Sequence, residues 1–185
     1  VAPENVIIST GAKQAIMVFL HTVLNPLEEV IFPTPYWVSY PDMVKLAGGV
    51  PVAVRAEDGS FRPRIQDIER VCGSYTKAII LNSPNNPSGI MYTREFIAEV
   101  VELCERKGLW LLMDDIYHRL CFDGRRPISA LEFAKKDVEN SRIVIINGVS
   151  KQYAMTGFRI GWAVGPRKLI EVMRTVQGHQ TSGPP

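Results

Sequence analysis

The sequence of 185 residues is poor in cysteine, carries little net charge and contains no long hydrophobic run. Its three cysteines, Cys72, Cys104 and Cys121, include no C-x-x-C pair, which indicates reduced thiols near a core and predicts a cytoplasmic protein. The formal net charge is only +2 and the basic residues are scattered, so we expect no nucleic-acid partner. No apolar stretch reaches the length of a bilayer span, so we expect no membrane partner.

The composition that remains is typical of a globular domain. With 46% hydrophobic and 22% charged residues, a chain of this length can bury one sizeable core. Short apolar strands are predicted at 6–8, 29–32, 50–54, 78–81, 110–113, 143–146 and 161–164. Amphipathic helices are predicted between them, at 11–24, 40–46, 65–71, 94–107 and 166–176, with a polar loop and a short helix over 125–136. This alternation predicts an α/β fold, with a mostly parallel sheet and helices on both of its faces.

Residues suited to chemistry follow the predicted strands. Each of five residues lies at or just after the end of a strand: Gly11, Trp37, Asn86, Asp114 and Lys151. In a parallel sheet that is covered on both faces, ligands bind beyond the carboxyl ends of the strands. The sequence therefore predicts that these residues share one site.

One lysine and one arginine stand among small residues in the stretch 147–161, NGVSKQYAMTGFRIG. Lys151 comes just after an apolar strand, where we expect it to be buried, and burial favours the neutral, nucleophilic amine. Arg159 keeps its proton and has the planar set of donors that binds phosphate. An amine beside a phosphate-binding arginine suggests a Schiff base to a phosphorylated aldehyde.

This stretch resembles the lysine motif of the class I/II aminotransferases that depend on pyridoxal 5′-phosphate (PLP), the aspartate aminotransferase family of fold type I. The resemblance implies PLP as the cofactor, Lys151 as the Schiff-base lysine that carries a proton between the substrate α-carbon and the C4′ carbon of the cofactor, and Arg159 as a ligand of the cofactor phosphate. The motif departs from the family at one position. Many relatives have a serine three residues before the lysine, where this chain has Gly148, and we expect Ser150 to replace its phosphate contact in part.

The loop 82–89, NSPNNPSG, resembles the N-P-x-N-P-[ST]-G loop of the same family. The resemblance implies that Asn86 binds the 3-oxygen of the cofactor and the carboxylate of the substrate. It also implies cis peptide bonds before Pro35 and Pro87. In the family an aromatic residue at the position of Trp37 stacks on the cofactor ring, and we assign Trp37 as well as Asn86 to substrate binding.

The run DDIY at 114–117 resembles the D-x-x-Y motif of the family. It implies that Asp114 partners the pyridine nitrogen, which makes the ring an electron sink, and that Tyr117 hydrogen-bonds the 3-oxygen. Both are predicted to be catalytic together with Lys151. We expect Asp115 to face elsewhere and His118 to be a loop histidine rather than a base.

The start of the first predicted helix offers free backbone N–H groups, and a helix N-terminus favours anions. In the family the corresponding loop holds the PLP phosphate, which implies phosphate-binding roles for Gly11, Ala12 and Lys13. We expect these contacts to come mainly from the backbone.

The resemblance covers the whole chain but only the central part of the family's large domain, because family members are about twice as long. We therefore expect residues 1–185 to be an incomplete PLP-binding large domain, with an N-terminal segment and a C-terminal small domain outside this sequence. The resemblance implies transamination between an amino acid and a 2-oxo acid, of the aspartate type with 2-oxoglutarate, in a homodimer and without a metal. A PLP-dependent β-lyase or an aminotransferase for another substrate would share these residues, and so would the non-catalytic PLP-sensing domain of some transcription regulators.

Overall fold

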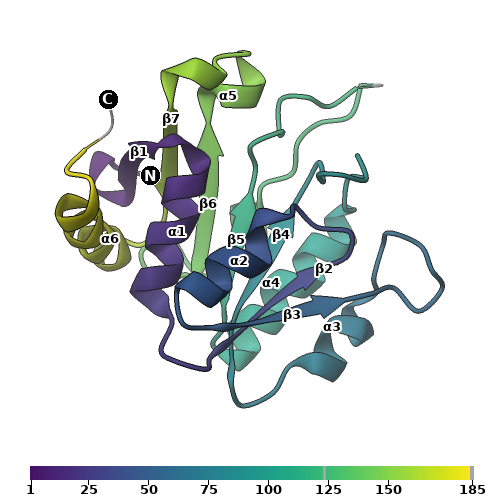
Figure 1. Ribbon diagram of the computed structural model, residues 1–185. Coiled ribbons are helices and arrows are strands. Elements are labelled where there is room, and N and C mark those ends of the chain that lie inside the picture. The colour runs from purple at the N-terminus through teal and green to yellow at the C-terminus, as the bar shows by residue number, and fades with distance from the viewer. Residues whose placement is uncertain (123, 184–185) are drawn as a thin grey trace.

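One sheet organises the computed structural model, which describes residues 1–122 and 124–183. Its seven strands are β1 (Val6–Thr10), β2 (Glu29–Pro33), β3 (Val50–Val54), β4 (Thr76–Asn82), β5 (Trp110–Asp114), β6 (Ile143–Gly148) and β7 (Ile160–Val164). They follow the order β1-β7-β6-β5-β4-β2-β3 across the sheet (Figure 1). The strand β7 runs antiparallel to its neighbours β1 and β6, and the other pairings are parallel. The predicted α/β fold with a mostly parallel sheet is confirmed.

Helices connect the strands. They are α1 (Gly11–Val23), α2 (Ser39–Leu46), α3 (Ile65–Val71), α4 (Arg94–Lys107), α5 (Val149–Gln152) and α6 (Arg167–Gln180), with short 3₁₀ turns η1 (Pro3–Asn5), η2 (Ala130–Glu132) and η3 (Thr156–Phe158). The limits of α4 agree with the prediction because both of its ends are capped. The side-chain oxygen of Thr93 accepts the Phe96 N–H at 3.2 Å, and Gly108 adopts the left-handed conformation, with φ of 68°.

The core forms two apolar layers, one on each face of the sheet. Helices α1, α2 and α6 cover one face, and α3 and α4 cover the other (Figure 1). Neighbouring residues of one strand serve opposite layers, as Ile79 and Ile80 of β4 do, because successive side chains of a strand point to opposite faces. Since both faces are covered, the central strands are apolar throughout rather than alternating.

The short helix predicted within 125–136 is wrong in extent, because only the 3₁₀ turn η2 forms there. The Ser129 hydroxyl caps this turn by accepting the Leu131 N–H at 3.3 Å. Apolar residues of this segment pack against the α4 layer from the turn and from the chain on either side of it, namely Ile128, Ala130, Leu131, Phe133 and Ala134.

Helix α6 runs to Gln180, beyond the end predicted at 176. Gln177 is buried, and its side-chain amide donates to the Ile8 carbonyl of β1 at 2.9 Å, which fastens the last turn to the sheet. Among the helices of residues 1–122 and 124–183, none has the length and apolar character needed to cross a membrane.

Candidate active site

The predicted site residues meet in one cavity beyond the carboxyl ends of the parallel strands, at the end of the sheet where α5 lies (Figure 1). The cavity has a volume of about 230 Å³. It is lined by Ala12, Lys13, Trp37, Asn82, Asn86, Asp114, Ile116, Tyr117, Ser150, Lys151, Thr156 and Arg159. Gly11, the remaining predicted residue, is buried against the Arg159 side chain. Segments far apart in the sequence therefore contribute to one site.

Asp114, the last residue of β5, places a buried carboxylate in the cavity wall. Its Oδ2 accepts a hydrogen bond from the Tyr40 hydroxyl at 2.6 Å, and its Oδ1 accepts one from the Ile116 N–H at 3.3 Å. Burial raises the pKa of Asp114 to about 6, and the two hydrogen bonds limit the rise because they stabilise the carboxylate. A carboxyl group in this state suits a ligand that presents a protonated nitrogen.

Tyr40 belongs to this site although the sequence did not identify it. Its side chain is buried in α2, and burial together with the neighbouring Asp114 carboxylate raises the pKa of its hydroxyl. Its ring meets that of Trp37 edge to face, with the ring centres 5.5 Å apart. The spacing of three residues between Trp37 and Tyr40 predicts that they lie on one face of a turn. No sequence pattern connects Tyr40 with Asp114.

The loop after β4 is held by Asn82, which the sequence analysis also did not single out. The Asn82 side-chain amide donates to the Asp114 carbonyl at 2.8 Å, and its oxygen accepts the Asn86 N–H at 2.7 Å. Asn86 is thereby fixed beside the end of β5. The peptide bonds before Pro35, Pro84 and Pro87 are cis. Two of these cis bonds were predicted, and the one before Pro84 was not.

Trp37 and Lys13 form an aromatic and cationic wall of the cavity. The Lys13 Nζ atom lies 4.9 Å from the centre of the Trp37 ring, a cation–π contact. The side chain of Lys13 therefore lies against Trp37, and both residues line the cavity. Tyr36 does not line the cavity and packs on Phe32, with ring centres 4.7 Å apart.

Lys151 approaches the cavity from α5, past the end of β6. Its Nζ atom lies 5.8 Å from the centre of the Tyr117 ring. The expectation that Lys151 is buried is wrong, because the residue is exposed. The reason is local: α5 is a single turn with no buried residue, and nothing within residues 1–122 and 124–183 covers it.

Arg159 and the start of α1 form a corner that suits an anion. An atom placed as Cβ on Gly11 would lie 2.6 Å from Arg159 Nη2, so only glycine lets the guanidinium come this close to the helix start. Gly11 also has φ of 77°, which disfavours other residues. A Cβ on Gly161 would lie 2.4 Å from the Ala12 nitrogen, so the strand after Arg159 packs directly on the first turn of α1. Free N–H groups and a guanidinium thus converge.

Gly148 has no room for the serine found in many relatives. A Cβ at this position would lie 2.9 Å from the Ile160 carbonyl oxygen. Ser150 and Thr156 line the cavity and can supply hydroxyl groups. Thr156, which the sequence analysis missed, also accepts a hydrogen bond at its carbonyl from Arg159 Nη1 at 2.7 Å.

Asp115 is buried but does not line the cavity. Its N–H donates to the Ile146 carbonyl at 2.9 Å, whereas its Oδ1 atom has no hydrogen-bond partner among the described residues. Burial, and then the charge of Asp114, raise the pKa of the Asp115 carboxyl to about 8. At neutral pH this side chain is therefore mostly a neutral acid.

Comparison with known proteins agrees with this architecture. Residues 1–185 match the family model described as aminotransferase class I and II. The chain is 42% identical over 183 residues to an aspartate aminotransferase of Bacillus subtilis and 44% identical over 187 residues to an aspartate/prephenate aminotransferase of Cereibacter sphaeroides. Each match covers 98% of this chain and 46% of the relative.

Solved structures give the same result. An aspartate aminotransferase from Thermus thermophilus, determined with maleate, matches with a TM-score of 0.92 and 38% identity, over 100% of this chain and 47% of the other. The chain thus spans about half the length of the relatives it matches. The sheet order, the cavity and these matches agree, and the chain belongs to the class I and II aminotransferase family.

Proposed function

We propose that this chain is the cofactor-binding part of a PLP-dependent aminotransferase of the aspartate type. The observation that carries the proposal is the meeting of Lys151, Asp114 and Arg159, from three separate segments, in one cavity. Aspartate aminotransferases of this family use PLP as their cofactor. The proposal rests on whether this cavity fits that group.

The cavity offers one residue for each reactive end of PLP. Its phosphate suits Arg159 and the N–H groups at the start of α1, where Gly11 places no side chain in between. Its ring nitrogen suits Asp114, whose buried carboxyl has a raised pKa and gains a cationic partner. Its aldehyde suits the amine of Lys151. The residues present therefore fit the cofactor.

The remaining lining residues have supporting roles in this proposal. Trp37 offers a flat ring for stacking on the cofactor ring. Asn86 and Tyr117 line the cavity and would hydrogen-bond the 3-oxygen, and Asn86 and Trp37 would also contact the substrate. Ala12 and Lys13 continue the phosphate-binding backbone from Gly11.

When bound, PLP supplies an electron sink for the negative charge that develops at the substrate α-carbon. Asp114 holds a proton at the ring nitrogen by placing a buried negative charge beside it. The Lys151 Nζ atom would take the proton from the substrate α-carbon and pass it to the C4′ carbon of the cofactor, and would carry a proton the opposite way when the 2-oxo acid is aminated. The Tyr117 hydroxyl would donate a hydrogen bond to the 3-oxygen, and the side-chain amide of Asn86 would orient the substrate carboxylate.

For the substrate we propose aspartate as amino donor and 2-oxoglutarate as acceptor. The relatives with the names quoted above support an aspartate-type reaction, and one of them was crystallised with maleate, a four-carbon dicarboxylate. These relatives do not favour the β-lyase or the transcription-regulator alternative.

The assembly and the location are also proposals. We propose that the complete protein is a homodimer, and that residues 1–185 are the core of its large domain, joined to an N-terminal segment and a C-terminal small domain. Light scattering at working concentration should give the mass of two chains, and the mass of one chain would contradict the dimer. The cytoplasmic location stays a prediction from Cys72, Cys104 and Cys121, which are unpaired thiols in the structure.

The test of the function is an assay on the full-length protein with PLP. Aspartate and 2-oxoglutarate should give oxaloacetate and glutamate. The oxaloacetate is detected through its reduction by a dehydrogenase that is added to the assay. Lys151→Ala should abolish turnover, whereas Lys168→Ala, an exposed lysine on α6, should leave it unchanged. Conversion of a cysteine conjugate to pyruvate without transamination would favour the β-lyase, and PLP binding without any turnover would favour the sensor domain.

A further inference from the structure

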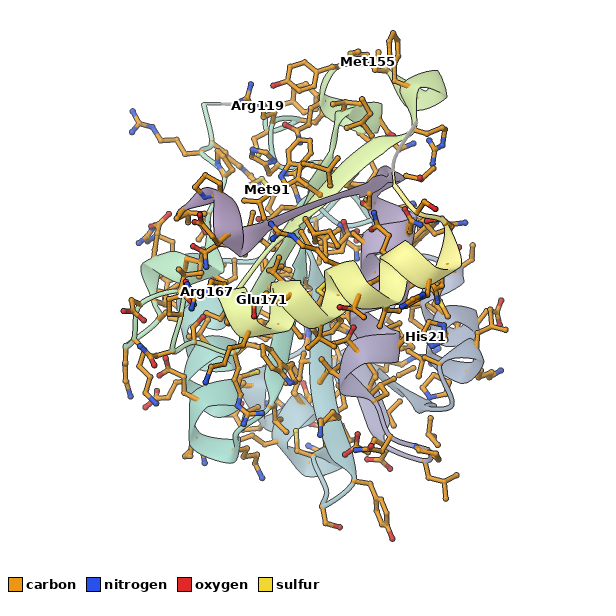
Figure 2. All side chains as sticks on the ribbon, turned by 90° about the vertical axis from the view of Figure 1, so that its left-hand side faces the viewer. His21, Met91, Arg119, Met155, Arg167 and Glu171 are labelled. Atoms are coloured by element: carbon orange, nitrogen blue, oxygen red, sulfur yellow. The ribbon has the colours of Figure 1, made fainter. Side chains whose placement is uncertain are left out.

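Two segments that carry proposed catalytic residues run side by side at the rim of the cavity. One is the turn 115–119 after β5, and the other is 147–153, which includes α5. Three pairs of contacts join them. The Lys151 Nζ atom lies 5.8 Å from the centre of the Tyr117 ring, and the Arg119 guanidinium carbon lies 5.6 Å from the centre of the Tyr153 ring. Figure 2 shows Arg119 at the same end of the molecule as Met155, which follows α5.

The third pair, Asn147 with His118, lies between the other two. The Asn147 Oδ1 atom accepts the Gly148 N–H at 2.8 Å and also accepts the side-chain amide of Gln152. Because Oδ1 is occupied by these donors, the Asn147 Nδ2 group must face His118, whose Nδ1 atom is 2.7 Å away. Toward Asn147 Nδ2, which can only donate, the Nδ1 atom of His118 is the acceptor. The same Nδ1 atom lies 3.0 Å from the Asp115 carbonyl oxygen, which can only accept, so this second contact is not a hydrogen bond in the tautomer that completes the contact with Asn147.

Gln152 is the link between this hydrogen-bond chain and the catalytic lysine, to which it is adjacent in α5. Its amide donates to Asn147 Oδ1 and also approaches the Gly148 carbonyl at 3.2 Å. Helix α5 has four residues and none of them is buried, so apolar packing contributes little to its position. Polar contacts to the end of β6 must hold it instead.

We propose that Gln152, Asn147 and His118 form a hydrogen-bonded clasp that positions Lys151 opposite Tyr117 and Asp114. This inference rests on the proposed function, in which Lys151 is the reactive amine. The clasp joins α5 to the turn 115–119, which directly follows Asp114, so that the amine and the carboxylate keep a fixed separation across the cavity. Its three members do not line the cavity, so we assign them as positioning residues.

The clasp has a specific chemical requirement at each end. At residue 152 it needs a donor, so Gln152→Ala and Gln152→Glu should both break it, since a carboxylate cannot donate to Asn147 Oδ1. At residue 118 it needs an acceptor near the imidazole Nδ1 position. His118→Ala should break the clasp, whereas His118→Asn keeps an oxygen acceptor there and should restore it. Asn147 is itself buried, so the test leaves it unchanged.

The first experiment is hydrogen exchange, read by mass spectrometry, on the full-length protein freed of PLP. Peptides that contain 149–153 should exchange roughly 3- to 10-fold faster in Gln152→Ala, Gln152→Glu and His118→Ala, the effect of losing one or two ordinary hydrogen bonds. His118→Asn should exchange like the unsubstituted protein. The matched control is Gln66→Ala, an exposed glutamine on α3 at the opposite end of the molecule, and it should leave 149–153 unchanged (Figure 1).

The second experiment links the clasp to Lys151. Each variant is mixed with PLP for a series of times, treated with borohydride, and analysed for PLP attached to the Lys151 peptide. Attachment should slow about as much as exchange accelerates, and kcat of the loaded enzyme should fall with little change in KM, because substrate contacts remain. A global loss of structure would instead raise exchange along the whole chain.

Three results are informative. Unchanged exchange and unchanged attachment in Gln152→Ala would overturn the clasp. Faster exchange with unchanged attachment would overturn its positioning role, because α5 would be loosened without consequence for Lys151. No attachment in the unsubstituted protein would refute the proposed function instead, and the exchange data would still decide whether the clasp holds α5.

Discussion

Removing the Tyr40 hydroxyl should raise the pKa of Asp114 and make the stability of the cofactor-free protein more dependent on pH. The hydroxyl donates to Asp114 Oδ2 at 2.6 Å, and both groups are buried. The hydrogen bond opposes burial, which raises the pKa of Asp114 to about 6. In Tyr40→Phe the ionised carboxylate loses this donor while its burial remains, so its protonated form is favoured further.

The size of the effect follows from the charge on the acceptor. A hydrogen bond to a charged group contributes about 1.5–3 kcal/mol, and one pH unit of pKa corresponds to about 1.4 kcal/mol. Tyr40→Phe should therefore raise the pKa of Asp114 by a further one to two pH units. Because the folded-state pKa of this acid is above its unfolded value, its contribution to the free energy of unfolding is full below about pH 4 and is lost as the pH rises through the folded pKa. In the variant that loss continues to a higher pH.

The assay is urea unfolding of the cofactor-free protein at pH 5 and at pH 8. The free energy lost on Tyr40→Phe should be about 1.5–3 kcal/mol larger at pH 8 than at pH 5. Tyr92→Phe is the matched control, because Tyr92 is also buried. The pKa of its hydroxyl is raised by burial, whereas that of Tyr40 is raised by burial and by the Asp114 carboxylate. The effect of Tyr92→Phe should be the same at both pH values. An equal loss at pH 5 and pH 8 for Tyr40→Phe would refute the role assigned to this hydrogen bond.

Three further predictions follow from other contacts. Gly161→Ala should destabilise the protein by about 3 kcal/mol in urea unfolding, because its Cβ would lie 2.4 Å from the Ala12 nitrogen, and unchanged stability would contradict that packing. Asp115→Asn should stabilise the cofactor-free protein by about 2–4 kcal/mol at pH 7, because burial raises the pKa of the Asp115 carboxyl to about 8 and the protein therefore loses stability as the pH rises from 4 to 8. The gain in the free energy of unfolding should vanish near pH 4. An equal gain at pH 4 and pH 7 would contradict this reasoning. Arg159→Ala should weaken PLP binding roughly tenfold in equilibrium dialysis, whereas Arg167→Ala on α6 should not, and equal affinities would exclude Arg159 from the phosphate site.

The elements of this fold were largely predictable because their limits depend on local chemistry. Helix α4 starts after the Thr93 cap and ends at Gly108, two residues that act within a few positions of themselves. The strands β4 and β5 are continuous apolar runs, which a sheet covered on both faces requires. The end of α6 was not predictable, because it depends on Gln177 reaching Ile8 at the other end of the chain.

The residues of the cavity also divide into those set by local sequence and those set by long-range contacts. Asp114, Asn86 and Lys151 were found because each lies at a strand end within a recognisable motif. The contact between Tyr40 and Asp114 joins residues 74 positions apart, and no local pattern records it. The exposure of Lys151 was also missed, because an apolar strand predicts the burial of its own residues and not of the turn that follows.

The most direct test of the proposed site is to identify the residue to which PLP attaches. The full-length protein would be titrated with PLP, followed by visible absorbance, reduced with borohydride and digested for mass spectrometry. We expect an absorbance band near neutral pH and one modified peptide, carrying PLP on Lys151 and not on Lys13 or Lys168. Stable attachment to another lysine, or PLP binding that leaves Lys151 unmodified, would contradict the assignment of Lys151 as the reactive amine.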